Sequence, residues 1–146
     1  MKKIGIDSSI IISAVHLNHP LHPVSANWIE NNLDRCDLIT AHHSLLEAYA
    51  VLTRLPSDLR VTPTEARDIL EGSIFKHVQI ADFNSNQMWD ILESIIGMPG
   101  IGGQSYDGFI LEIMKKNRID GFATFNSSHF EALHSPFKII NPAQPA

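Results

Sequence analysis

Short apolar segments alternate with longer amphipathic ones along almost the whole chain, and this alternation limits the possible folds more than any other feature. The apolar segments predict strands at 3–7, 37–41, 78–81, 121–125 and 137–140. Helical spacing predicts helices at 10–15, 24–33, 44–55, 63–75, 84–96 and 105–117. Because strands that alternate with helices form parallel sheets, the sequence predicts an α/β fold with a central parallel sheet of about five short strands.

The length and composition fit one globular domain over residues 1–146. The chain is 44% apolar and 18% charged, an ordinary balance for a folded domain. Trp28 and Trp89 fall on apolar helix faces and are predicted to lie in the core. Residues 141–146 contain two prolines and little apolar surface, so we expect a loosely ordered tail there.

The chain shows no feature of a membrane or secreted protein. No apolar run reaches the length of a membrane span, and the N-terminus lacks the pattern of a signal peptide. Cys36 is the one cysteine in the chain, so no internal disulfide can form. These observations predict a cytoplasmic protein with no membrane partner.

The formal net charge is −5 with neutral histidines. A protein that holds nucleic acid by broad electrostatic attraction is usually basic, so this charge argues against that mode of binding. It is more typical of a protein whose acids gather where a cation neutralises them.

Asp7 stands at the end of the first predicted strand, just before a helix that Ser8 or Ser9 can cap. In open parallel sheets, ligands bind beyond the carboxyl ends of the strands, which favours a metal or phosphate site here. The alternative is an acid that only complements the dipole of the following helix. Position alone leaves both open.

Glu47 is the one acid in a helix that otherwise consists mostly of leucine, alanine, valine and tyrosine. A helix of this composition is expected to be buried, and a buried carboxylate must be paired, protonated or bound to metal. Arg54 lies two turns further on the same face. A structural ion pair between Glu47 and Arg54 is therefore the alternative to a metal site.

Asp107 lies in the first turn of the last predicted helix, where capping or the helix dipole would also explain an acid. Combined with Asp7 and Glu47, it suggests more. Carboxylates that converge repel each other unless a cation is present, and hard oxygen ligands favour Mg²⁺ or Mn²⁺. Such a cation can support water attack on a phosphodiester without a nucleophilic side chain.

Four segments resemble the successive motifs of PIN domains, in the same order and over nearly the whole chain. They are Ile4–Ile11, Ser44–Pro56, Gln104–Leu111 and Thr124–Phe130. Two further segments, His19–His22 and Thr62–Ala66, are similar to the VapC-type toxin branch of that family.

The resemblance implies a three-layer α/β/α fold and a Mg²⁺- or Mn²⁺-dependent endoribonuclease that is the toxin of a toxin–antitoxin pair. It also implies a VapB-like antitoxin partner and a homodimer. Asp7, Glu47 and Asp107 match the first three acids of the family, and the metal is expected on Asp7 and Asp107.

The resemblance also marks a departure, since many PIN domains have a fourth acid where this chain has Asn126. An amide oxygen can still ligate a cation or hold a water, but it adds no charge. Thr124 and His129 are further candidates for holding water, phosphate or metal, and Arg54 for contacting the substrate. For Thr124 and His129, an ordinary strand threonine and a surface histidine are the alternatives.

A different class of function is also open. The missing fourth acid and the acidic net charge fit a PIN-like module that binds RNA or a protein and does not cut. A nuclease of the same chemistry acting on DNA is a third interpretation.

Overall fold

The computed structural model describes residues 1–73, 76–98, 102–133 and 135–144. Within them, five strands form one fully parallel sheet in the order β3-β2-β1-β4-β5. The strands are β1 (Lys2–Ile6), β2 (Cys36–Ala41), β3 (Val78–Ala81), β4 (Gly121–Ala123) and β5 (Lys138–Ile140). The predicted parallel sheet is confirmed, with strand ends within two residues of those expected.

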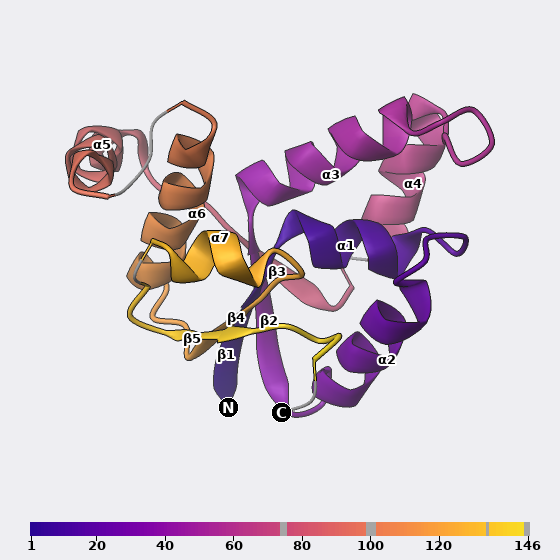
Figure 1. Cartoon of the computed structure of the whole chain (residues 1–146), viewed down its shortest axis with the longest axis horizontal. Coiled ribbons are helices and arrows are strands. Elements are labelled where there is room, and N and C mark those ends of the chain that lie inside the picture. The colour runs from indigo at the N-terminus through magenta and orange to yellow at the C-terminus, as the bar shows by residue number, and fades with distance from the viewer. Residues whose placement is uncertain (74–75, 99–101, 134, 145–146) are drawn as a thin grey trace.

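Helices cover both faces of the sheet, which gives the three layers that the resemblance implied (Figure 1). On one side lie α1 (Ser8–Val15), α2 (His22–Asn32), α3 (His42–Arg54) and α4 (Pro63–Ser73). On the other lie α5 (Met88–Ile96), α6 (Gln104–Lys116) and α7 (Ser127–Glu131), with the 3₁₀ turn η1 (Ser85–Gln87) before α5. All six predicted helices are present; the end expected near Phe75 lies outside the described residues.

The strands are apolar on both sides because each face of the sheet has its own core. Side chains alternate along a strand, so Ile4 and Leu38 face α1–α4, whereas Ile39 and Phe122 face α6 and α7. Strands buried on both faces read as continuous apolar runs, which is why the sequence showed them clearly.

Several local predictions need correction. Asp7 itself caps α1 by accepting a hydrogen bond from the Ser8 amide, where a serine cap was expected. The helix α2 begins at His22 and includes Pro23 in its first turn. Backbone amides in the first turn have no hydrogen-bond partner within the helix, so a proline, which has no N–H, is tolerated there. The helix α7 was not predicted because it has only five residues.

Trp89 is 77% exposed, so its expected place in the core is wrong. The helix α5 buries Ile91, and the indole lies on the opposite side of the helix. Trp28, in contrast, packs against the core of α1–α4 as expected.

No helix in the described part combines the length and the apolar composition that a membrane crossing requires. Near the C-terminus, the Gln144 amide donates to the Asn141 carbonyl in a turn. The last two residues of the predicted tail, 145–146, lie outside the described residues.

Gly5 allows α6 to approach the central strand. A Cβ built on Gly5 would lie 2.8 Å from the Met114 Sδ and 2.8 Å from the Phe122 ring, both buried. We expect Gly5→Val to lower the free energy of unfolding by about 1–3 kcal/mol, the usual cost of overpacking a core. Urea denaturation measures this change.

Gly72→Ala is the matched control, because a Cβ at this position would have no described atom within 4 Å and the residue is exposed in α4. This variant should be neutral or slightly stabilising. Equal stability of the Gly5 and Gly72 variants would show that the close approach is not needed.

Candidate active site

The candidate site lies at the edge of the sheet where the central strands end. Asp7 follows β1 directly, α3 follows β2 directly, and Thr124 follows β4 directly. Since β1 lies between β2 and β4, these three chain segments are neighbours at one edge. The helix α6, on the other face, brings Asp107 to the same region.

Asp7 is buried and held by donors from two segments of the chain. Its Oδ1 accepts a hydrogen bond from the Ser8 amide at 2.8 Å. Its Oδ2 accepts one from the Thr124 hydroxyl at 2.7 Å and one from the Ser9 hydroxyl at 3.1 Å. The carboxylate therefore links the end of β1 to the segment that follows β4.

No lysine or arginine of the described part forms an ion pair with Asp7. Burial raises the pKa of Asp7, and the hydrogen bonds from Thr124, Ser8 and Ser9 oppose that rise only in part. Asp7 is thus a buried acid whose negative charge lacks a cationic partner within the described residues.

The candidate acids interact electrostatically, as the shift in the pKa of Asp107 indicates. The pKa of Asp107 is raised to about 6, first by burial, then by the charge of Asp7 and also by that of Glu47. His129 acts in the opposite direction on the same carboxyl. Three acids and one histidine therefore surround a common region.

Glu47 is exposed, which corrects the expectation that it is buried in an apolar helix. Only Ser44, Ala48 and Leu52 of α3 are buried, one narrow stripe of the helix. Glu47 lies off that stripe. The premise that set Glu47 apart in the sequence was wrong, although the residue does lie near Asp107.

Arg54 does not fill the role of partner to Glu47. It is exposed at the last residue of α3, and no ion pair joins it to Glu47 in the described part of the chain.

Thr124 has a larger role than its type and place suggested. It is fully buried, its hydroxyl donates to Asp7, and the same hydroxyl accepts a hydrogen bond from the backbone N–H of Asn126 at 2.9 Å. Asn126 and His129 are exposed, at the start and middle of α7. The Asn126 side chain makes no capping bond to α7, which leaves its amide oxygen free of that role.

Ser8 and Ser9 were expected only as caps, yet both hydrogen-bond to Asp7. The signal that could have found them is their order, since hydroxyls that directly follow a strand-end acid can reach it. Within the described residues, no three His, Cys, Asp or Glu side chains form a ready-made metal cage.

The donors nevertheless suit a hydrated hard cation. Mg²⁺ usually keeps several waters and takes one or two carboxylates from the protein. Asp7 and Asp107 carry carboxylate oxygens with raised pKa values and form no ion pair with lysine or arginine in the described part, so a cation would relieve their repulsion. The residues fit the implied metal without a preformed cage.

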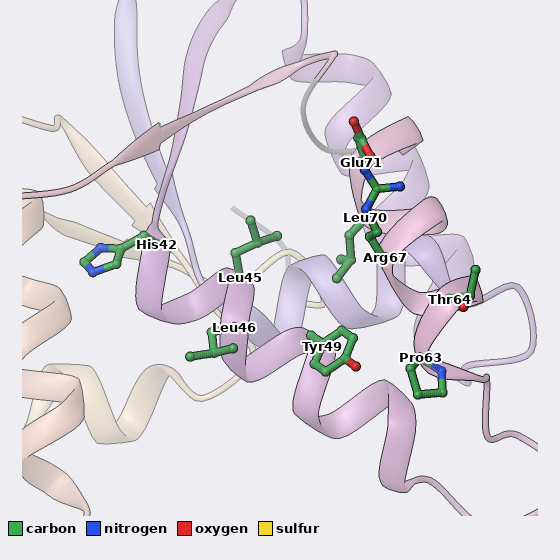
Figure 2. Close-up of a pocket in the computed structure, with 9 residues that line it drawn as sticks. All are labelled: His42, Leu45, Leu46, Tyr49, Pro63, Thr64, Arg67, Leu70 and Glu71. Atoms are coloured by element: carbon green, nitrogen blue, oxygen red, sulfur yellow. Dashed lines mark ion pairs between the residues drawn. The ribbon is translucent and has the colours of Figure 1, made fainter.

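A separate groove of about 820 Å³ lies between α3 and α4, and none of the candidate acids lines it. Figure 2 shows its residues on the two helices, with Leu45 and Leu70 pointing into the space between them. Leu46, which also lines the groove, is 65% exposed. The apolar residues of α3 are therefore divided: Ala48 and Leu52 lie in the core, whereas Leu46 is exposed in the groove.

Comparison with known proteins gives one curated relative and several solved structures. Ribonuclease VapC27 of Mycobacterium tuberculosis is 37% identical over 68 residues. That segment covers 46% of this chain and 46% of the relative, so the match spans about half of each protein. No protein-family model matches the chain.

The solved structures match over nearly the full length. VapC20 of Mycobacterium tuberculosis, described as a sarcin-ricin loop cleaving toxin, aligns with a TM-score of 0.67 at 15% identity, over 88% of this chain and 94% of that one. VapBC2 of Rickettsia felis, bound to a promoter DNA fragment, aligns with a TM-score of 0.70 at 15% identity, over 95% and 98%. The chain has the PIN-domain fold of the VapC proteins.

The raised pKa of Asp107 implies that the stability of the folded chain depends on pH. Between the ordinary value of 3.8 and about 6, the folded chain holds a proton on Asp107 and the unfolded chain does not. The contribution of Asp107 therefore lowers the free energy of unfolding as pH rises through this window. Asp107→Asn should stabilise the domain above pH 6, measured by urea denaturation across that range.

Asp58→Asn, at an exposed loop residue, is the control. It should follow the pH dependence of the unsubstituted chain. If the two variants are equally stable at pH 7, the carboxyl of Asp107 is not under the strain that burial and its neighbours imply.

Proposed function

We propose that this chain is a divalent-metal-dependent endoribonuclease. The observation that carries the proposal is the buried Asp7 carboxylate, which has no cationic partner in the described part and acts electrostatically on Asp107. The PIN-domain fold and the partial match to Ribonuclease VapC27 support RNA as the substrate.

Asp7 and Asp107 would hold Mg²⁺ or Mn²⁺, with Glu47 and Asn126 contacting it directly or through water. When bound, such a cation neutralises charge on the phosphate and makes water a better nucleophile at neutral pH. The donor set of carboxylate and amide oxygens suits these hard ions.

The protein's own groups orient and tune these ligands. Thr124 and Ser9 fix the Oδ2 atom of Asp7, so the carboxylate has one orientation before any ligand arrives. The exposed carboxylate of Glu47 is accessible to solvent and can accept a proton from an attacking water. His129 can interact with a phosphate oxygen, since it lies near enough to Asp107 to lower the pKa of that carboxyl electrostatically.

The second candidate function is a PIN-like module that binds RNA or protein and does not cut. Its support is Asn126, which supplies no charge where many PIN domains have an acid, together with the net charge of −5. Metal binding and cleavage separate the two functions.

Asp7→Asn tests the catalytic role. We expect this variant to keep its fold and to lose at least about a hundredfold in the rate of RNA cleavage with millimolar Mn²⁺, because a central ligand is lost. Cleavage of a structured RNA followed on gels gives the rate, and circular dichroism reports the fold. Asp58→Asn should cut as well as the unsubstituted chain.

Two outcomes would contradict this assignment. Metal-dependent cleavage that survives Asp7→Asn would place the metal elsewhere. An unsubstituted chain that is neither stabilised by Mn²⁺ nor able to cut any structured RNA would be the binding module.

We further propose that a VapB-like antitoxin occupies the groove between α3 and α4. Grooves lined by apolar side chains receive amphipathic helices, and Arg67 and Glu71 offer charges at the rim on α4. The solved VapBC structures of similar fold support a partner of this class. With a net charge of −5, the chain favours a basic or mixed-charge partner.

Leu46→Glu tests the partner site, since Leu46 is exposed and can change without loss of the fold. Co-expressed with the VapB-like antitoxin that this proposal requires, the unsubstituted chain should purify as a complex. We expect Leu46→Glu to weaken that complex by at least about tenfold, the effect of an apolar contact replaced by an unpaired charge. Leu17→Glu, at a leucine exposed outside the groove, should leave it intact; equal affinities would exclude the groove.

The implied homodimer stays a prediction. Trp89, Leu92 and Ile96 form an exposed stripe on α5, and such a stripe would suit a second copy of the chain. The cytoplasmic location expected from the sequence also stays a prediction.

A further inference from the structure

Two aromatic rings stack face to face between the helices that carry the candidate acids. The His43 ring of α3 and the Tyr106 ring of α6 have centroids 5.0 Å apart and planes 5° apart. His43 precedes Glu47 by one helical turn, and Tyr106 directly precedes Asp107. The stacked pair therefore lies beside the proposed catalytic centre.

Other aromatic rings pack against the His43 side of the pair, whereas the Tyr106 side is exposed to solvent. Phe109 packs edge-on against His43 at 6.2 Å and against Phe83 at 5.1 Å. Phe83 and Phe109 are half-buried, whereas Tyr106 is 58% exposed. Tyr106 therefore contacts His43 on one face while more than half of its surface meets water, which leaves part of the ring available to a ligand.

The acidic net charge of the protein suggests a role for the exposed Tyr106 ring in binding RNA. RNA binding through phosphates needs lysine and arginine, yet the chain has net charge −5 and its candidate site gathers three acids. No lysine or arginine in the described part pairs with those acids. Base stacking supplies affinity that does not depend on charge, so it suits a site that gathers acids.

We propose that the His43–Tyr106 stack is a platform for an unpaired RNA base beside the bond that is cut. The inference rests on the proposed ribonuclease function and adds to it the pair of residues that would contact a base. A base inside a duplex is already stacked and cannot lie on Tyr106. The free face of Tyr106 receives the base, and His43 holds the phenol ring in place.

The chain has two tyrosines, Tyr49 and Tyr106, which makes a direct test possible. Uniform labelling with 3-fluorotyrosine gives one fluorine signal from each. On titration with a single-stranded RNA octamer of mixed sequence, in Ca²⁺ to limit cleavage, the Tyr106 signal should shift because a stacked base changes its surroundings. The Tyr49 signal, in the groove between α3 and α4, should stay in place. Tyr106→Phe removes one signal and assigns the spectrum.

Affinity provides the second measurement, by fluorescence polarisation of the same octamer on the full chain. Tyr106→Leu should weaken binding by roughly tenfold, as loss of one base–aromatic stack does. Tyr106→Phe, which keeps the ring, should remain within about twofold. Leu17→Ala is the control, since this apolar side chain is exposed and belongs neither to the stack nor to the groove between α3 and α4. Binding of a blunt RNA duplex should not respond to Tyr106→Leu.

Several results would overturn the proposal. They are an unmoved Tyr106 signal at saturating RNA, equal losses from Tyr106→Leu and Leu17→Ala, or no single-strand binding by the unsubstituted chain. If Tyr106→Leu fails to fold, the fluorine shift of the unsubstituted protein decides alone. Octamer binding that depends on Tyr106 without any cleavage would keep the platform and reject the nuclease, so the two failures are distinguishable.

Discussion

The hydrogen bond from Thr124 to Asp7 is the contact on which the geometry of the site depends. It joins the segment after β4 to the end of β1 at 2.7 Å, and both residues are buried. A buried carboxylate without a cation costs several kcal/mol. Each hydrogen bond to its charged form returns about 1.5–3 kcal/mol, so the donors around Asp7 make an otherwise unfavourable charge tolerable. The remaining deficit is what a cation would remove.

The sheet explains why acids distant in sequence come together. Parallel strands all end at the same edge, and β1 has β2 and β4 on its two sides. Asp7 is therefore central, α3 brings Glu47 from one side, and α6 brings Asp107 across the opposite face. Gly5 contributes by letting α6 pack closely against β1, so the distance between the acids is tied to the core. Stability and the site are coupled through this packing.

The sequence was informative wherever a residue pattern has one structural solution. Short apolar runs buried on both faces located the five strands of the described residues, and the sequence from Thr62 to Glu65 forms a capping box at the start of α4. It was misleading where apolar composition does not mean burial. In α3, Leu46 is exposed in a groove although Leu52 is buried, and Trp89 is exposed on a helix that buries Ile91.

Polar contacts across the fold were the least predictable part of the site. Thr124 and Asp7 are 117 residues apart, and no local pattern in either segment signals that their side chains meet. The stacked rings of His43 and Tyr106 were unpredictable for the same reason. They lie on two different helices, and the tertiary structure brings them together. Such contacts depend on tertiary structure, which periodicity and propensity do not encode.

An acidic active site poses a problem for a protein that acts on RNA, because the groups that hold a cation also repel phosphate. A cation resolves this conflict only at the reacting bond, and the flanking nucleotides still meet a surface of the same sign. Aromatic stacking attracts the base while leaving the charge at the site unchanged. In the proposed enzyme, the exposed Tyr106 next to the Asp107 carboxylate would let one helix supply both a metal ligand and substrate affinity. Lysines at the same place would bind phosphate but would also compete with the metal for the acids.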